Sequence, residues 1–227
     1  MQPVLNHSWN LTETEAIELQ QELARQVVKE DCYSSIQYVA GVDVAYSEHS
    51  DKLIAAVVIL ESDTLNLVES IVVEDHVQFP YIPGLFSFRE LPPIVKAFDQ
   101  LKNTPQLVVC DGQGIAHPRR FGLASHLGLL FDVPAIGCGK TRLLGEYEEP
   151  GSTRGASSPL VDRNEVIGNV LRTQDAIKPI FVSIGHRISL NSACDWILRL
   201  APSYRLPETT RHADQLVNRV LSGLKGE

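Results

Sequence analysis

The chain has 227 residues, of which 44% are hydrophobic and 21% are charged, so it should fold around a sizeable core. Its formal net charge of −8 argues against a broad electrostatic grip on nucleic acid but leaves local basic patches open. It has no run of about 18 apolar residues and no secretory signal pattern, so we expect a cytoplasmic protein without a membrane span. We expect one domain over residues 1–227.

The four cysteines are scattered, and none belongs to a CxxC pair. They therefore provide no zinc framework, and in a cytosolic protein they should be reduced. Cys110 and Cys138 lie in apolar, strand-like runs and should be small core residues.

The first predicted element is an amphipathic helix over residues 13–30. Thr12 and Glu15 form a capping box at its start, and apolar side chains then recur at helical spacing. Three strand-like runs follow, and turns at 48–51 and 62–63 separate them, which predicts an antiparallel meander. These runs cover residues 36–46, 53–60 and 65–75.

Residues 80–84, Pro-Tyr-Ile-Pro-Gly, should form a rigid loop because two prolines prevent regular structure there. A helix follows to about residue 101, and we expect it to break or restart at Pro92 and Pro93. The rest of the chain predicts a strand at 107–110, a helix at 121–131, a strand at 135–138, a loop at 146–159, a hairpin of 166–172 with 179–184, and helices at 190–200 and 207–221.

Three antiparallel strands followed by two parallel ones predict an α/β protein with a mixed sheet that helices flank. In such a sheet, the first strand can lie beside the strand at 107–110. That buried strand ends on Asp111, and a glycine turn follows. Open α/β sheets bind their ligands at this kind of edge. His117, Arg119 and Arg120 lie just beyond and suggest that the ligand carries phosphate.

Asp43 and Asp111 would be neighbours if those two strands pair. Two close carboxylates repel, and a divalent cation removes that penalty, with oxygen ligands favouring Mg²⁺ or Mn²⁺ over zinc. Glu90 is a candidate third acid. Each acid also has a structural alternative: Asp43 as a polar residue on a solvated face, Asp111 as a turn residue, and Glu90 as part of a capping box with Ser87.

Lys140 belongs to a Gly-Lys-Thr sequence of the kind that ends a P-loop. The first glycine of that motif would fall at position 134, which is Pro134, so the motif fails, although Lys140 can still contact phosphate as a point charge. Near the carboxyl end, Arg211 and Asp214 share a helix face, which predicts a surface ion pair. Asp214 is also a candidate fourth acid.

Taken together, these segments resemble the endonuclease V family of inosine-directed nucleases. The resemblance rests on three segments: Ala-Gly-Val-Asp-Val-Ala-Tyr at 40–46, Pro-Tyr-Ile-Pro-Gly through Phe-Arg-Glu at 80–90, and Asp-Gly-x-Gly-x-x-His-Pro-Arg-Arg at 111–120. Further matches lie at 122–126, at 134–137 with Lys140, and from Arg154 to 172. The similarity spans roughly residues 12–220.

The resemblance implies a ribonuclease H-like fold with a carboxylate cluster that binds Mg²⁺, for which Mn²⁺ can substitute. Asp43 and Asp111 would hold the metal, with Glu90 as the third acid. Asp214 matches a position that is acidic in some members and histidine in others. Gln113 stands where several relatives have histidine.

The resemblance also implies that Tyr81 is a wedge that enters the duplex beside the lesion. His117 and Lys140 would steady the phosphate. The remaining DNA-binding residues would be Pro80, Ile82, Pro83, Gly84, Gly112, Arg119 and Arg120, with the two glycines lining a pocket for the extruded base.

The implied activity is DNA repair on double-stranded or single-stranded DNA that contains deaminated bases. The enzyme would hydrolyse the second phosphodiester bond 3′ to deoxyinosine and leave 3′-hydroxyl and 5′-phosphate ends. An endoribonuclease specific for inosine is a second possible function. A P-loop phosphotransferase and a non-catalytic lesion-binding module are a third and a fourth. We expect a monomer.

Overall fold

Eight strands form one mixed sheet in the computed structural model, which describes residues 1–48 and 50–224. β1 (Tyr38–Tyr46), β2 (Lys52–Glu61) and β3 (Leu67–His76) form the expected antiparallel meander. β1 also pairs in parallel with β4 (Leu107–Cys110), which pairs in parallel with β5 (Ala135–Gly139), as predicted. The turn expected at 48–51 includes residue 49, which lies outside the described residues.

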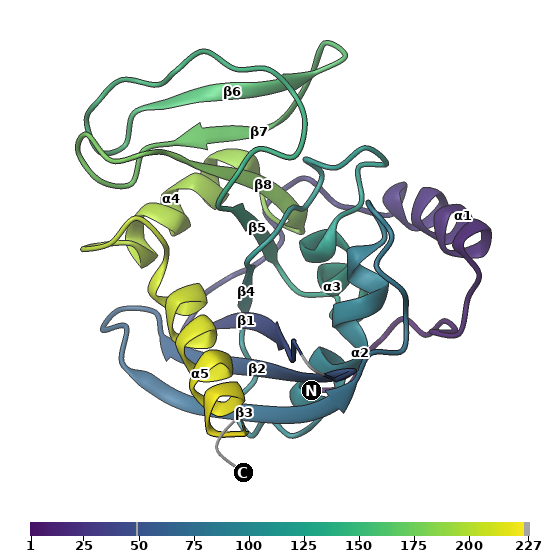
Figure 1. Cartoon of the computed structure of the whole chain (residues 1–227). Helices are drawn as coiled ribbons and strands as arrows, with labels where there is room; N and C mark the ends of the chain where they lie inside the picture. Colours follow the sequence, from purple (N-terminus) through teal and green to yellow (C-terminus); the bar gives the residue numbers. More distant parts are fainter. Residues whose placement is uncertain (49, 225–227) are drawn as a thin grey trace.

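The late hairpin extends this same sheet. β8 (Ile180–His186) pairs antiparallel with β5, and β7 (Glu165–Leu171) pairs antiparallel with β8. The order across the sheet is therefore β3-β2-β1-β4-β5-β8-β7-β6 (Figure 1).

β6 (Ser157–Asp162) was not predicted, because its first residues were assigned to a loop at 146–159. It pairs antiparallel with β7 at the edge of the sheet. Leu160 is its one buried side chain, so it shows no apolar alternation. Backbone pairing with β7, which a hydrophobic pattern does not reveal, holds this strand in place.

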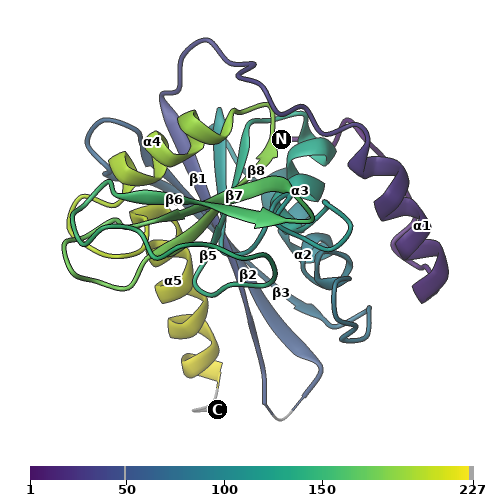
Figure 2. The same ribbon diagram turned by 90° about the horizontal axis from the view of Figure 1, so that it is seen from above.

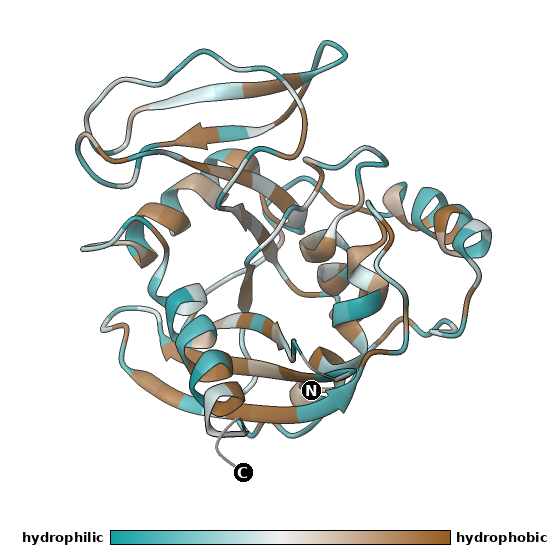
Figure 3. Cartoon of the chain, viewed as in Figure 1, coloured by the Kyte–Doolittle hydropathy of each residue, from teal (hydrophilic) through white to brown (hydrophobic). Residues whose placement is uncertain are grey.

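Helices cover both faces of the sheet. Figure 2 shows α2 (Phe86–Asp99) and α3 (Leu123–Phe131) on one side and α4 (Leu190–Leu200) and α5 (Glu208–Leu224) on the other. α1 (Glu13–Ala24) lies outside α3. In Figure 3 the strands are mostly brown, whereas α1 and α5 carry hydrophilic turns. No helix in the described part of the chain is both long and apolar enough to cross a membrane.

β1 alternates between these two faces. Ala40, Val42 and Val44 belong to the core beneath α2 and α3. Gly41 faces α5, and a Cβ there would lie 2.2 Å from the carbonyl oxygen of Thr209, so only glycine permits this close approach. Asp43 follows Gly41 on the same side of the strand.

α1 and α2 differ most from the predicted helices. α1 ends at Ala24 rather than at residue 30, because the backbone of Val28 bonds to residues 186 and 187 instead of continuing the helix. The Val28 N–H donates to His186 Nδ1 (3.2 Å), and the Val28 carbonyl accepts from the Arg187 N–H (2.7 Å). α2 does not break at Pro92 and Pro93. The two prolines remove backbone donors, but the helix buries a continuous apolar face against the sheet, and this packing keeps it helical.

The amino-terminal segment packs over α2 and α3. The amino group of Met1 donates to the Phe98 carbonyl (2.7 Å), and Val4 N–H donates to the Leu130 carbonyl (2.7 Å). Trp9 lies against Phe88, with the ring centroids 6.4 Å apart. These contacts lead the residues that precede α1 from the last turn of α2, past the end of α3, to the first turn of α2.

Candidate active site

Two aspartates lie side by side where the parallel pairing of β1 with β4 ends. Val42 of β1 is opposite Cys110 of β4 in the parallel register, and Asp43 and Asp111 follow these two residues. The sequence-based expectation that the two strands are adjacent is therefore confirmed. The Asp43 carboxyl is mostly buried, and burial first, then the negative charge of Asp111, raise its pKa to about 7.

Glu90 approaches the same point from α2. It is 5% exposed, and its Oε1 accepts a hydrogen bond from the Tyr46 hydroxyl at 3.1 Å. Burial, followed by the charge of Asp43, raises the pKa of Glu90 well above its usual value. The expected capping box is wrong: the N-cap of α2 is Leu85, no side chain caps the helix, and Ser87 bonds to His126 instead.

Lys140 follows β5 and lies between two of the acids. Its Nζ is 2.5 Å from Asp111 Oδ2 and 3.8 Å from Asp214 Oδ1. Burial alone would lower the pKa of Lys140, but the hydrogen bond to Asp111 and the surrounding acids raise it. The predicted pairing of Arg211 with Asp214 is wrong, since Arg211 Nη1 lies 3.3 Å from Glu208 Oε1 and Asp214 faces the lysine.

The donor set fits a hard divalent cation. Asp43, Glu90 and Asp111 offer only carboxylate oxygens, and Asp43 and Glu90 have pKa values raised by burial and by their facing acids. A divalent cation would relieve this mutual repulsion. Across residues 1–48 and 50–224, no three His, Cys, Asp or Glu side chains already stand as a closed metal cage. Asp111 instead contacts the ammonium of Lys140.

A cavity of about 450 Å³ opens beside these acids. Tyr81 stands at it with 71% of its surface exposed, and Phe86 and Leu143 are also exposed there. The wall combines apolar side chains with a few polar groups, as small-molecule sites commonly do. Its lining includes Ile82, Pro83, Gly84, Ser87, Asp111, Gly112, Gln113, His117, Leu123 and Lys140.

Polar side chains hold the loop that carries Tyr81. Gly84 adopts a φ of +81°, and its carbonyl accepts hydrogen bonds from Arg119 Nη2 (2.7 Å) and Gln20 Nε2 (2.9 Å). His117 is buried in the cavity wall. Burial, and next the charge of Arg119, lower its pKa to about 4, so at neutral pH it is a neutral polar group rather than a cation.

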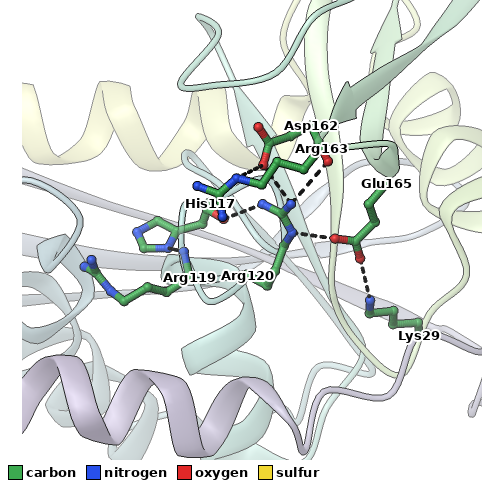
Figure 4. A network of polar contacts seen from close by, with 7 residues as sticks. All are labelled: Lys29, His117, Arg119, Arg120, Asp162, Arg163 and Glu165. Carbon is green, nitrogen blue, oxygen red and sulfur yellow. Dashed lines mark hydrogen bonds and ion pairs between the residues drawn. The ribbon is translucent and has the colours of Figure 1, made fainter.

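Arg119 and Arg120 both have partners within the protein. Figure 4 shows the two guanidinium groups pointing in different directions, with Arg120 inside an ion-pair network. Arg120 Nη2 lies 2.7 Å from Asp162 Oδ2, and its Nε lies 2.7 Å from Glu165 Oε2. Arg119 is bonded to Gln20 and Gly84. Arg119 thus holds the cavity loop and Arg120 the β6–β7 hairpin, and contact of either arginine with DNA stays a prediction.

Sequence reasoning missed three polar residues around the site. Tyr46 bonds to Glu90, Gln20 bonds to the cavity loop, and Ser87 lines the cavity. Strand alternation predicts that Tyr46 faces the α2 side of β1, but not its bond to Glu90. Nothing in the sequence indicated Gln20, since its contacts join residues far apart in the chain.

The sheet order, with the two aspartates where the parallel strands β1 and β4 cease to pair, defines a ribonuclease H-like protein. Residues 21–215 match the family described as Endonuclease V, and the chain belongs to the endonuclease V family of nucleases.

Named relatives agree with this assignment. Endonuclease V of Nostoc punctiforme is 49% identical over 214 residues, which cover 94% of this chain and 97% of the relative. The crystal structure of Endonuclease V from Streptomyces avermitilis is 45% identical, with a TM-score of 0.92 over 99% of this chain and 100% of that one. Endonuclease V of Ciona intestinalis, in complex with a 24mer DNA containing an inosine followed by a ribo-adenosine, is 27% identical, with a TM-score of 0.82 over 93% of this chain and 98% of that one.

Proposed function

We propose that the protein is a DNA repair endonuclease that binds a deaminated base, above all deoxyinosine, and cuts on its 3′ side. The bond hydrolysed would be the second phosphodiester 3′ to the lesion, which leaves 3′-hydroxyl and 5′-phosphate ends. The observation that carries this proposal is the position of Lys140. It lines both the cavity beside Tyr81 and a groove that contains Asp43 and Asp214. A base held in the cavity would thus have its strand beside the acids.

Asp43, Asp111 and Glu90 would hold the metal, for which we propose Mg²⁺, with Mn²⁺ as a substitute. When bound, such a cation neutralises charge on the scissile phosphate and supplies an activated water. Glu90, buried and fixed by the Tyr46 hydroxyl, would orient that water or accept its proton. Lys140, next to Asp111, would steady a phosphate oxygen through its fixed positive charge.

The cavity would take the extruded base. A base leaves the stack at a cost of a few kcal/mol, and the cost is smallest when it is mispaired. Tyr81 is exposed on a loop that Pro80 and Pro83 stiffen, so its ring is available to fill the vacated space in the duplex. The apolar wall near Leu123 and the backbone of Gly84 and Gly112 would enclose the flipped base.

A nicking time course on a duplex with a single deoxyinosine tests this proposal. With Mg²⁺ we expect one nick on the inosine strand, mapped on a sequencing gel to the second bond 3′ of the lesion. A matched duplex with deoxyadenosine and a reaction in EDTA should remain intact. Cleavage at another bond would contradict the proposed position, and a nick in EDTA would contradict the metal site.

Inosine in RNA is the second candidate substrate. It has support in the Ciona relative, whose bound DNA carries a ribo-adenosine after the inosine. Paired oligonucleotides of one sequence, with deoxyinosine in DNA or inosine in RNA, decide between the two through kcat/KM. A metal-dependent nick on either oligonucleotide would exclude a lesion-binding module without catalysis. Absence of ATP hydrolysis would exclude a P-loop phosphotransferase.

A further inference from the structure

A chain of hydrogen bonds runs from the amino-terminal segment to the cavity. His126 on α3 is fully buried, and both of its ring nitrogens are engaged: Nδ1 lies 3.0 Å from Ser87 Oγ, and Nε2 lies 2.8 Å from His7 Nε2. His7 Nδ1 in turn lies 2.8 Å from the carbonyl oxygen of Ser8. At the other end, Ser87 is 2% exposed and lines the cavity.

The direction of this chain follows from its last acceptor. A carbonyl oxygen only accepts, so His7 carries its proton on Nδ1 and leaves the lone pair on Nε2. His126 must then donate from Nε2, and its Nδ1 is left as an acceptor. The Ser87 hydroxyl therefore donates to His126. No donor among the described residues bonds to the Ser87 oxygen, so its lone pairs remain available.

Both histidines are neutral near pH 7, which keeps this direction fixed. Burial, and then the proximity of His7, lower the pKa of His126 well below its usual value, and burial lowers the pKa of His7. Their surroundings are aromatic: the His126 ring centroid lies 5.1 Å from that of Phe88 and 5.6 Å from that of Trp9. An imidazolium is costly in such an apolar environment.

We propose that Ser87 is a specificity-determining residue of the cavity, with its oxygen accepting a hydrogen bond from the N1–H of the deaminated purine. His126 and His7 are positioning residues that set its polarity. This inference rests on the proposed function. Deamination of adenine turns the ring nitrogen N1 from an acceptor into an N–H donor. A fixed acceptor facing N1 would favour hypoxanthine and repel adenine, since two facing lone pairs leave both groups unpaired.

A Ser87→Ala variant, assayed on two bases, tests the proposal. The probes are a duplex with deoxyinosine and one with deoxynebularine, whose purine lacks the N1 proton. We expect kcat/KM on deoxyinosine to fall about tenfold, the usual effect of losing one hydrogen bond, while the low rate on deoxynebularine stays unchanged. An equal loss on both substrates, or no loss on either, would overturn the proposal.

A His7→Phe variant tests the positioning role from outside the cavity. Phenylalanine keeps an aromatic ring but removes the acceptor for His126 Nε2–H. The hydrogen bonds can then reverse direction, so that His126 donates to Ser87 and the Ser87 hydroxyl donates into the cavity. Cleavage of deoxynebularine should then rise relative to deoxyinosine, which mere loosening of the fold would not cause. Val4→Ala, an exposed change in the same segment, is the control and should leave the ratio of the two rates at the wild-type value.

Thermal melting of each variant separates loss of fold from loss of selectivity. Failure of the proposed function is also distinguishable. If the wild-type protein does not nick deoxyinosine DNA, the function itself is refuted. If it does nick and neither Ser87→Ala nor His7→Phe changes the ratio of rates, only the assignment of Ser87 is refuted.

Discussion

At the residue scale, Asp43 shows how one side chain depends on its neighbours. Gly41 lets α5 approach the strand, and the parallel register with β4 puts Asp111 alongside. The result is a buried carboxyl that faces other acids instead of a cationic partner of its own. Such an arrangement is costly for the folded state, and it is typical of a site whose chemistry requires it.

We predict that Asp43→Asn and Asp111→Asn each reduce Mg²⁺-dependent nicking on the order of a thousandfold, because each removes a charged ligand that binds and orients the cation. In EDTA, Asp43→Asn should be at least as stable as the wild type, because one of two repelling carboxylates is gone, whereas Asp111→Asn also loses the ion pair with Lys140. Nicking rates and melting temperatures measure these effects. Asp63→Asn, an exposed acid paired with Arg199, is the control and should keep full activity. Wild-type rates for either site variant would contradict the metal assignment.

The acids were predictable at this scale, and the polar shell around them was not. Asp43 and Asp111 each end or interrupt an apolar strand, and the family resemblance singles out Glu90. By contrast, the partners of Ser87 and Arg120 lie 39 to 45 residues away in the chain. Only the packing of α2 on α3, and of the hairpin on the 117–120 turn, brings these groups together. Their contacts therefore follow from tertiary structure rather than from any local pattern.

At the element scale, the loop at 80–84 is held at Gly84 but leaves the Tyr81 side chain exposed. Gln20 and Arg119 hold the Gly84 carbonyl, whereas Tyr81 is 71% exposed. The wedge proposed for Tyr81 needs this combination, because a fixed loop lets an exposed ring enter the duplex with little loss of entropy.

We predict that Tyr81→Ala weakens binding of an inosine duplex about tenfold to a hundredfold, the range for removing one aromatic stacking contact. Tyr81→Phe should bind nearly as well as the wild type, since the ring is retained. Neither change should alter the melting temperature, because the side chain is exposed. Fluorescence anisotropy with labelled duplex and Ca²⁺ in place of Mg²⁺ measures the affinity. Equal affinity of the alanine and phenylalanine variants would count against the wedge.

The β6–β7 hairpin is the second element whose placement depends on a few groups. Arg120 joins the turn that carries His117 to both strands, and it does so through Asp162 and Glu165. All three side chains are at least partly buried, so the charges are less screened than on an open surface.

We predict that Arg120→Ala lowers the free energy of unfolding by about 1–3 kcal/mol, because it removes the guanidinium that Asp162 and Glu165 share at a partly buried position. Hydrogen exchange should quicken in residues 157–171. Lys29→Ala breaks only the more exposed pair with Glu165 and is the control, with an expected loss below about 1 kcal/mol. If both variants lose the same stability, the hairpin is held by other contacts.

The elements that sequence reasoning placed well are those with a strong apolar pattern. The prediction for α4 matches its residues, and β4 likewise matches, since both have a clear buried face. β6 lacks such a face, and α2 contains two prolines that suggested a break. In both cases tertiary contacts outweighed local preference, which a single sequence does not display.

At the scale of the whole molecule, buried ionisable groups make the free energy of unfolding depend on pH in two opposite directions. Asp43 and Glu90 have raised pKa values, so their contribution is present at low pH and lost as the pH rises through the folded pKa. His117 has its pKa lowered to about 4 from a usual value of 6.5. Its contribution is therefore lost as the pH falls below about 6.5, where the unfolded chain takes up the proton first.

We predict that the wild-type protein loses about 2 kcal/mol more stability than His117→Gln between pH 7.5 and pH 5. The comparison isolates one histidine, because the two acids are the same in both proteins. Urea denaturation at several pH values, in EDTA, gives the two free energies of unfolding. Parallel curves for the two proteins would show that His117 titrates normally.

The sheet runs from β3 to β6 without closing, so each end presents a strand to solvent. On β6, Pro159 lacks an N–H, and Glu146 exchanges two backbone hydrogen bonds with Val161, which covers part of the outer side. On β3, the acidic side chains of Glu69, Glu74 and Asp75 are spaced along the strand. Both edge strands therefore resist pairing with another copy of the chain. An enzyme that works on a long polymer benefits from staying dispersed along it.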